Sequence, residues 1–233
     1  MSEQSQANSK LPSCLGFIMD GNRRWANSQG LDVVKGHEHG HEVFVECGRW
    51  LRDNQIRHAV FYAFSTENWN RPQREVDYLM NLISEMLAKM DEKIDEEGVR
   101  VRIVGRWSDF SEKLQAQFAE LEEKSKKYDE GTTVWIALSY GGRAEIVAAV
   151  NQAIAAGKEL TEANFEALLW SAELPEPDMI VRTSGEHRLS GFMTWKGVYS
   201  ELHFIDKHWP ALTRADFDAI LEEYGTRERR RGT

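Results

Sequence analysis

Hydrophobic and polar residues along the chain follow two periods that alternate with each other. Short runs of consecutive apolar residues, which are typical of buried strands, fall at residues 17–19, 58–64, 99–105, 133–138, 179–183 and 202–205. Between these runs, apolar side chains recur every three or four residues and predict helices at 43–51, 75–97, 111–127, 143–156, 161–170 and 213–230. This alternation favours βα units. We therefore predict an α/β fold with a mainly parallel central sheet of about six strands flanked by helices.

The length and composition suit one domain. The chain has 233 residues, of which 41% are hydrophobic, and this is enough for a substantial core. Because no linker, repeat or low-complexity tract interrupts it, we expect a flexible N-terminal segment at 1–13 and one domain at 14–233. The longest apolar runs are far too short to cross a bilayer, and the first ten residues lack the apolar core of a signal peptide. We therefore expect a cytoplasmic protein.

Charge and cysteine content exclude some classes of function. The 29 basic and 38 acidic residues give a net charge of −9, which argues against general nucleic-acid binding. The two cysteines, Cys14 and Cys47, have no metal-type spacing, so neither a disulfide framework nor a thiolate zinc site is indicated. An acidic protein that binds anions must gather its arginines locally, and this chain does so in several places.

The most informative cluster follows the first predicted strand. Asp20 ends the apolar run, Gly21 allows a tight turn, and Asn22 could cap a helix whose first turn carries Arg23 and Arg24. Free amides at a helix start and two guanidiniums can hold a diphosphate. A carboxylate beside that site makes chemical sense if a divalent cation bridges it to the phosphate oxygens. The alternative is a loop with a solvated Asp20 and a capping Asn22.

Two further polar clusters follow predicted strands. One contains Ser65, Asn68, Trp69 and Arg71, and the other contains two arginines and a serine within 182–190, with Glu201 further on. The second could hold a phosphate, and its acid could help to hold a cation. In open parallel sheets, ligands bind beyond the carboxyl ends of the strands. We therefore expect all three clusters to line one crevice.

Residues 37–41 spell HExxH, the pattern of zinc proteases when it lies on a helix. The glycines at 36 and 40 make a weak helix start, and no third zinc ligand is evident downstream. One hypothesis is a zinc hydrolase that uses His37. The other is that His39 and His41 are surface histidines at a helix end.

With these residues in place, the chain resembles the cis-prenyltransferase family, which includes bacterial undecaprenyl diphosphate synthases. The resemblance runs from about residue 15 to residue 232. It rests on MDGNRRWA from Met19, GH at 36–37, YAFSTENWNRP from Tyr62, YGGR from Tyr140, IVRTSGEHRLSGF from Ile180 and SELHF from Ser200. It implies Mg²⁺-dependent condensation of isopentenyl diphosphate onto an allylic diphosphate such as farnesyl diphosphate. The product would be undecaprenyl diphosphate or a shorter cis-prenyl diphosphate.

The resemblance also implies roles for individual residues. Asp20 would be the magnesium-linked acid, and Ser65 and Asn68 would lie near the reacting carbons and assist proton removal. Glu201 would be a second metal-linked acid, with His187 beside it. The substrate-binding residues implied are Gly21, Asn22, Arg23, Arg24, Trp25, His37, Trp69, Arg71, Glu75, Arg182, His187, Arg188 and Ser190. A homodimer is implied as well, in which Arg230 and Gly232 of one copy reach the isopentenyl site of the other.

Two positions of the chain depart from the pattern of the family. Lys35 stands near the place where many relatives have an arginine, and Trp135 where the family often has asparagine. If the Trp135 indole pointed into a hydrophobic tunnel lined by the apolar stripe of 76–94, it would limit product length, whereas small Ala63 leaves room. A non-catalytic subunit that binds isoprenoid diphosphates is a further alternative. A long-chain product would require transient contact with the inner face of the membrane.

Overall fold

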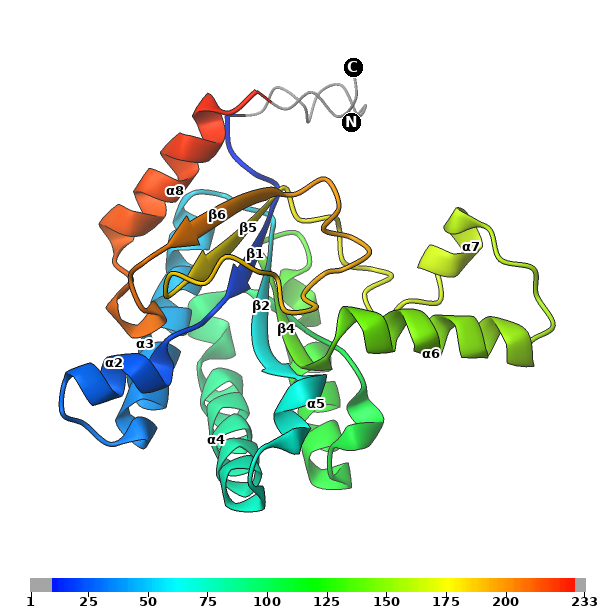
Figure 1. Cartoon of the computed structure of the whole chain (residues 1–233), viewed down its shortest axis with the longest axis horizontal. Helices are drawn as coiled ribbons and strands as arrows, with labels where there is room; N and C mark the ends of the chain where they lie inside the picture. Colours follow the sequence, from blue (N-terminus) through cyan, green and yellow to red (C-terminus); the bar gives the residue numbers. More distant parts are fainter. Residues whose placement is uncertain (1–9, 229–233) are drawn as a thin grey trace.

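The computed structural model describes residues 10–228. Their fold is built on one six-stranded sheet (Figure 1). All the strand pairs in this sheet are parallel, and the strand order is β3-β4-β2-β1-β5-β6. The strands are β1 (Cys14–Ile18), β2 (His58–Ser65), β3 (Arg100–Val104), β4 (Thr133–Tyr140), β5 (Met179–Thr183) and β6 (Glu201–Ile205). β4 and β5 are buried along their whole length, as expected for strands covered on both faces. The predicted parallel α/β fold is confirmed.

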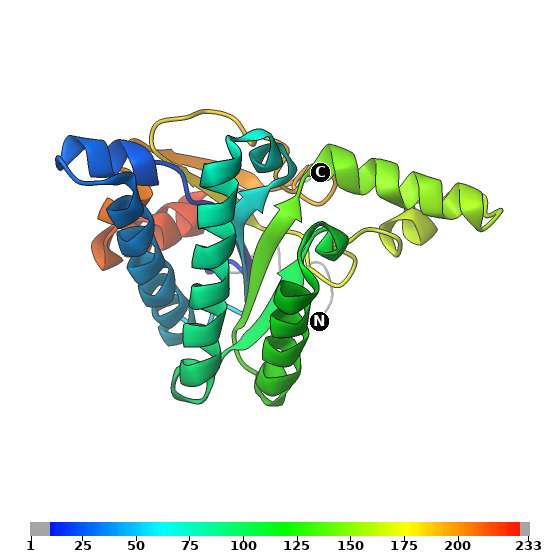
Figure 2. The same cartoon turned by 90° about the horizontal axis from the view of Figure 1, so that it is seen from below.

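Seven α-helices flank the sheet in the described part of the chain. Figure 2 shows three long helices side by side along one face, and α8 packs on the same side. The apolar side of these helices forms the larger core with alternate strand residues such as Phe17, Phe61 and Ile136. The helices are α2 (Asn22–Ser28), α3 (Val33–Asp53), α4 (Gln73–Glu97), α5 (Glu112–Ser125), α6 (Gly142–Ala155), α7 (Glu162–Glu166) and α8 (Arg214–Thr226).

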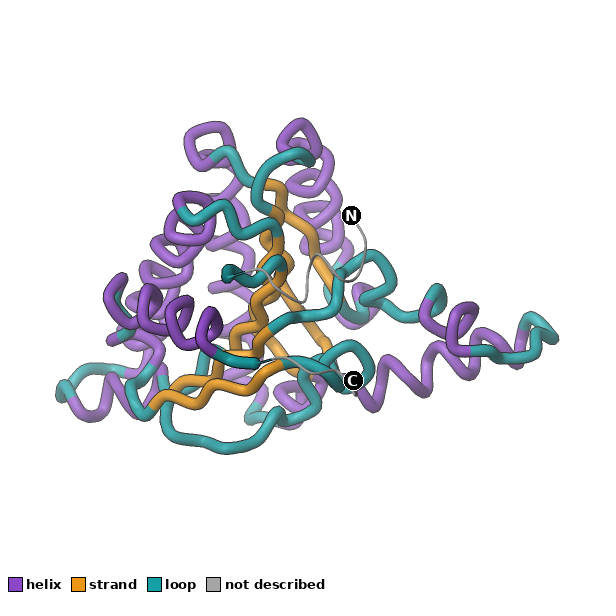
Figure 3. The backbone as a smooth tube through the Cα atoms, turned by 90° about the horizontal axis from the view of Figure 1, so that it is seen from above, coloured by secondary structure: helices purple, strands orange, loops and turns teal. Residues whose placement is uncertain are grey.

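The opposite face of the sheet is covered mainly by irregular backbone. Leu174, from the connection between α7 and β5, packs there together with Phe192 and Met193, from the connection between β5 and β6. They contact strand residues such as Val60 and Ile180. α6 and α7 extend away from the sheet as an arm, which Figures 1 and 3 both show. The two faces therefore differ. One is a helical layer and the other is a tightly packed loop layer.

Strand register brings the carboxyl ends of the central strands together. Ile18 at the end of β1 pairs with Tyr62 of β2 on one side and with Arg182 of β5 on the other. From β1 the chain proceeds to β2, β3 and β4 on one side of the sheet, and β5 and β6 lie on the other side. The end of β1 is thus the place where strand connections diverge, and this is where open α/β sheets bind ligands.

The helix bounds differ most from the sequence prediction in α3, in α7 and in α8, which ends at Thr226 rather than at 230. α3 begins at Val33 and includes the whole of 37–41, although glycine disfavours helix. Asp32 starts it by accepting a hydrogen bond from the Val34 amide at 2.9 Å. α7 ends at Glu166 rather than at 170, because the chain turns there to pack Leu169 with Phe165 under α6.

Trp135 lies on the loop-covered face of the sheet. Its neighbours Val134 and Ile136 point to the helical side, because strand side chains alternate between faces. The indole Nε1 donates to His58 Nδ1 at 3.4 Å, and the Arg102 guanidinium lies 5.0 Å above the ring. Trp135 is therefore a packing residue that does not face the helical side.

Candidate active site

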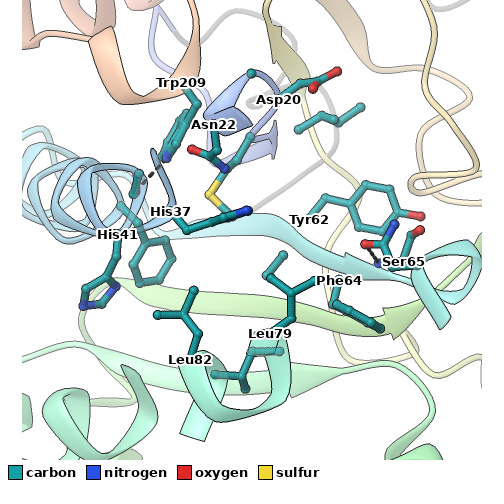
Figure 4. A pocket seen from close by; sticks show the side chains of 18 of the residues that line it. Asp20, Asn22, His37, His41, Tyr62, Phe64, Ser65, Leu79, Leu82 and Trp209 are labelled. Carbon is teal, nitrogen blue, oxygen red and sulfur yellow. Dashed lines mark hydrogen bonds between the residues drawn. The ribbon is translucent and has the colours of Figure 1, made fainter. Parts of the chain in front are cut away.

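A cavity of about 650 Å³ opens beyond the ends of β1 and β2 and runs between the sheet and the helical layer (Figure 4). Its mouth is polar and carries Asp20, Arg23, Arg24, Arg71 and Arg182. Its interior is apolar. It is lined from α4 by Leu79, Leu82, Ile83, Met86, Leu87 and Met90, and from β4 by Ile136 and Leu138. Such a space suits a ligand with a charged head and a hydrocarbon body.

Asp20 lies at the centre of this polar mouth. Its Oδ2 accepts a hydrogen bond from Arg182 Nη2 at 2.8 Å, and its Oδ1 lies 3.2 Å from Arg24 Nη2. Burial raises the pKa of Asp20, but the hydrogen bonds and charges of Arg182 and Arg24 outweigh it, so the pKa lies below its ordinary value. Asp20 is therefore ionised at neutral pH.

Gly21 makes the turn that follows Asp20. Its φ is 104°, and an added Cβ would lie 2.6 Å from Ser184 Oγ, so a side chain is excluded by both conformation and space. The Ser184 hydroxyl is in turn hydrogen-bonded to His208 Nδ1 at 2.6 Å. Gly21 occupies the N-cap of α2, so Asn22 is the first helical residue and not the predicted cap.

Asn22 is fixed by an unusually close approach of α3. A Cβ added at Gly36 or Gly40 would come within 3.0 Å of the Asn22 carbonyl or of its Oδ1, respectively. Trp209 closes the same corner, since its Nε1 donates to the Gly40 carbonyl at 2.7 Å. The Asn22 Oδ1 is buried without a hydrogen-bond partner among the described residues. The glycines of 36–40 therefore serve helix packing beside the cavity.

A second group of side chains surrounds the mouth from α4. Glu75 Oε1 holds both Arg23, at 3.2 Å, and Arg71, at 3.1 Å. Burial and the charges of these two arginines lower the pKa of His37, which Glu75 opposes only in part. His37 therefore faces the cavity as a neutral imidazole at neutral pH.

The cluster after β5 joins the first cluster through Arg182. Arg182 is only 4% exposed and donates from Nη1 to Ser190 Oγ at 2.8 Å, while its Nη2 binds Asp20. Its Nε is buried without a partner in residues 10–228. Arg24 donates to Glu186 Oε1 at 3.0 Å, and Glu186 also pairs with Arg188. Two predicted anion sites are thus one continuous array.

The loop after β2 completes the mouth. The Ser65 amide donates to Asn68 Oδ1 at 3.1 Å, and the two residues form a capping box at the start of the short helix η1 (Thr66–Asn70). Both line the cavity, whereas Trp69 does not. The Trp69 ring packs against Phe64 and Phe110. The Trp69 ring therefore anchors the loop to the hydrophobic core.

Trp69 is held by a polar chain that the sequence did not reveal. Its Nε1 donates to Ser139 Oγ at 2.8 Å, the Ser139 hydroxyl donates to Asp109, and Asp109 accepts from Arg106 Nε at 2.8 Å. Ser139 has a φ of 45°. The signal in the sequence for this support is Asp109, which ends the short helix η2 (Trp107–Asp109) after β3.

The structure does not bring Glu201 to Asp20. Glu201 is the first residue of β6 and pairs with Met179, the first residue of β5. It therefore lies at the amino ends of the strands, whereas the cavity lies beyond their carboxyl ends. Its Oε2 lies 2.7 Å from Arg227 Nη1. Within one chain, the two acids therefore lie at opposite ends of the sheet and do not share a cation.

Other predicted residues lie outside the cavity lining. His187 stacks on Phe204 at 4.8 Å, and Trp25 lies 4.7 Å from the His39 ring. Lys35 Nζ pairs with Glu38 at 2.7 Å. Arg230 and Gly232 lie outside the described residues. Within 10–228, no group of three or more His, Cys, Asp or Glu side chains is placed to hold a metal.

This donor set fits Mg²⁺ better than zinc. Zinc sites use three or four nitrogen, sulfur or carboxylate ligands from the protein. Mg²⁺ prefers oxygen, keeps several waters, and is usually held by one or two carboxylates together with substrate phosphates. Ionised Asp20 between two arginines offers such an oxygen ligand next to an anion site. His41, the second histidine of 37–41, lines the cavity as part of α3 rather than lying at a helix end.

Comparison with known proteins gives a consistent result. The prenyltransferase family model for undecaprenyl diphosphate synthases matches residues 18–232. An isoprenyl transferase of Thermotoga maritima is 44% identical over 96% of this chain and 97% of its own length. A ditrans,polycis-undecaprenyl-diphosphate synthase of Micrococcus luteus, specific for (2E,6E)-farnesyl diphosphate, is 38% identical over 96% of this chain and 92% of its own.

Solved structures agree with this. Lavandulyl diphosphate synthase from Lavandula x intermedia, in complex with dimethylallyl diphosphate, superposes with a TM-score of 0.90 and 30% identity. The alignment covers 96% of this chain and 99% of the synthase. A probable undecaprenyl diphosphate synthase from Campylobacter jejuni gives 0.81 and 31%, over 95% and 99%. The chain therefore belongs to the undecaprenyl diphosphate synthase family of prenyltransferases.

Proposed function

We propose that this protein condenses isopentenyl diphosphate onto an allylic diphosphate and elongates it as a cis-prenyl chain. The observation that carries the proposal is the Asp20–Arg182 pair at the mouth of an apolar cavity of about 650 Å³. A charged mouth and an apolar interior match a diphosphate head and a prenyl tail. The named activity of the Micrococcus luteus relative supports farnesyl diphosphate as the starter.

The arginines divide the two diphosphates between them. The α2 side, with Gly21, Asn22, Arg23 and Arg24, and His37 of α3 would bind the allylic diphosphate. Trp25 supports that side from outside the cavity lining. Arg182, Arg188 and Ser190 would bind the diphosphate of isopentenyl diphosphate, and His187 would support that loop against β6. Arg182 touches both Asp20 and Ser190, so it lies where the two heads meet.

Mg²⁺ would be held by Asp20 together with phosphate oxygens. When bound, it neutralises negative charge that develops on the leaving diphosphate. The protein adds Arg24 and Arg182, whose guanidiniums stabilise the same charge and orient the phosphates. Glu201 would act on a metal only at a site to which another copy of the chain contributes, because it lies far from Asp20 in its own copy.

Bond changes in the condensation balance without a covalent enzyme intermediate. The alkene of isopentenyl diphosphate forms the new carbon–carbon bond to the allylic carbon, and diphosphate leaves with the electrons of the broken carbon–oxygen bond. One proton then leaves the isopentenyl unit. Ser65 and Asn68, which line the mouth, would guide that proton away. Arg71, which follows η1, and Glu75 of α4 would shape the pocket beside them. Positioning supplies most of the catalysis.

A homodimer is part of this proposal. β6 is an edge strand whose Leu202 is exposed, and Val198 and Tyr199 just before it are about two-thirds exposed. An edge strand beside exposed apolar side chains is a favourable surface for association with another chain. A partner covering it would have its own Arg230 and Gly232 available to complete the isopentenyl site. Sedimentation should show a dimer, and charged substitutions at Val198 and Tyr199 should shift it toward monomer.

Contact with a membrane would be transient and limited to product release. No helix among residues 10–228 is long and apolar enough to span a bilayer. A long prenyl product, in contrast, would partition into lipid because its hydrocarbon chain is apolar. Vesicle flotation with and without bound product tests this step, and flotation of the product complex alone is the expected result.

Incubation of the protein with labelled isopentenyl diphosphate, farnesyl diphosphate and Mg²⁺ tests the proposal. Chain-extended cis product is expected, and it should vanish with EDTA and return with Mg²⁺. Binding of both diphosphates without any product would instead favour a non-catalytic subunit. Stoichiometric zinc with hydrolytic activity dependent on His37 and His41 would favour the zinc hydrolase, which the comparisons do not support.

A further inference from the structure

A second cavity of about 130 Å³ lies between α3 and α4, beyond the inner end of the first. The two cavities have three lining residues in common, His41, Phe44 and Met90. These three side chains therefore form the wall that separates the two spaces. The far side of the second cavity is formed by Val45, Gly48, Lys89, Lys93, Ile94, Glu97, Val99 and Val134.

The three wall residues differ in what holds them. Phe44 belongs to the core and packs edge-to-face on Phe61, with ring centroids 4.7 Å apart. Met90 is unbranched and partly buried, so it can move aside at little cost. His41 stacks on Phe44 at 6.2 Å, and its Nδ1 is buried without a hydrogen-bond partner in the described chain.

An unpaired buried nitrogen is not explained by stability. Leaving such a group unsatisfied destabilises the folded state. An aliphatic residue of similar size would pack at this position without that cost. His41 also lies one helical turn from His37, and both residues line the first cavity, His37 at its polar mouth (Figure 4).

The cavity volumes give the wall a measurable consequence. A protein cavity of about 150 Å³ accommodates benzene, which has six carbons, so each carbon needs roughly 25 Å³. A five-carbon isoprene unit then needs roughly 125 Å³. The second cavity, at about 130 Å³, therefore has room for about one more unit.

We propose that His41 sets the longest product of this enzyme by closing the passage between the two cavities. The inference rests on the proposed function, because it requires a prenyl chain that grows inward from the mouth. Growth stops when the tail meets the His41 ring. Replacing that ring with a methyl group joins the two spaces and admits further isoprene units.

The test compares product lengths after exhaustive incubation with farnesyl diphosphate, isopentenyl diphosphate and Mg²⁺, sized by mass spectrometry. His41→Ala should lengthen the longest abundant product by at least one five-carbon unit. His41→Leu, which preserves bulk without the nitrogen, should retain the parent length. Glu42→Ala, an exposed neighbour on α3 that lines neither cavity, is the matched control and should also retain it.

A second variant reverses the effect. Gly48 lines the second cavity, and a Cβ added there meets nothing within 4 Å, so Gly48→Leu adds bulk at this cavity from an uncrowded position. His41→Ala combined with Gly48→Leu should return the product to the parent length. Thermal melting of each variant establishes that it is folded. If His41→Ala fails to fold, His41→Ser is used for the same comparison.

The outcomes separate this inference from the proposed function. If the unmodified protein makes no chain-extended product, the proposed function fails. If it does, and His41→Ala gives the parent length distribution, the role of His41 is overturned while the function stands. Lengthening by His41→Leu would also overturn it, because bulk would then not be what closes the passage.

Discussion

Replacing Gly40 with alanine is a sensitive test of how α3 positions the site. Alanine normally stabilises a helix interior relative to glycine by about 0.5–1 kcal/mol. At Gly40, however, the new Cβ would come within 3.0 Å of Asn22 Oδ1, whereas ordinary contacts start at 3.4 Å. Trp209, whose ring lies 3.2 Å from the same Cβ, prevents the methyl group from moving the other way.

The expected magnitude follows from this geometry. Asn22 must withdraw by roughly 1 Å, and displacements of that size can lower the rate by about 10²-fold. Overpacking costs about 1–3 kcal/mol, which the helix preference of alanine offsets only partly. We therefore expect kcat/KM to fall by about 10²-fold and the free energy of unfolding to fall by about 1 kcal/mol.

Gly48→Ala on the same helix is the matched control. Its Cβ meets nothing within 4 Å, so this variant should be more stable by about 0.5–1 kcal/mol and should keep the parent kcat/KM. Steady-state turnover of labelled isopentenyl diphosphate and urea unfolding measure both effects. If Gly40→Ala behaves like Gly48→Ala, the tight approach of α3 to Asn22 does not position the site.

Three further predictions address other parts of the structure. Asp109→Ala should lower stability by about 1–3 kcal/mol and reduce kcat, because Ser139 and Trp69 lose their support; urea unfolding and turnover measure this, and an unchanged kcat would contradict it. Burial and the Arg57 charge lower the pKa of His58 from 6.5 to about 4, so the unfolded chain binds the proton first and stability should fall as pH drops from 6.5 to 4. His58→Gln should reduce that fall by about 1 kcal/mol after allowance for partial exposure, as measured by unfolding at pH 7 and pH 5. EDTA should abolish turnover without changing the melting temperature by more than a few degrees, since no cluster of metal ligands lies in the described fold.

Much of the fold could be predicted from local sequence patterns. The apolar runs of β2, β4 and β5 are nearly uninterrupted, which is the mark of strands buried on both faces. Their parallel order followed from the helices between them. The start of α3 could not be predicted, because its glycines are explained only by Asn22, which packs against them across the α2–α3 contact. Propensity reports on local preference and not on such tertiary contacts.

The candidate site was predictable where the chemistry is local. Asp20 and Arg24 follow β1, Arg182 lies near the end of β5, and the sheet brings their side chains together. The position of Glu201 could not be predicted from residue type, because the register puts it at the start of β6 and away from Asp20 of its own copy. Its predicted role at a cation therefore requires a second copy of the chain. His41 was not recognised as a cavity residue, because only its tertiary position shows that it lies between two cavities.

Asp20 is the acid proposed to hold Mg²⁺ at the mouth of the cavity. Asp20→Asn retains an oxygen that can accept from Arg182 but removes the charge that would hold Mg²⁺. Glu186→Gln, which weakens another ion pair of Arg24, is the matched control.

Turnover of labelled isopentenyl diphosphate with farnesyl diphosphate and Mg²⁺ is measured for both variants and the parent, with thermal melting to confirm folding. Asp20→Asn should lose at least about 10²-fold in kcat, whereas Glu186→Gln should change kcat far less. Turnover by a folded Asp20→Asn variant equal to that of the parent would contradict the role of Asp20 in holding Mg²⁺.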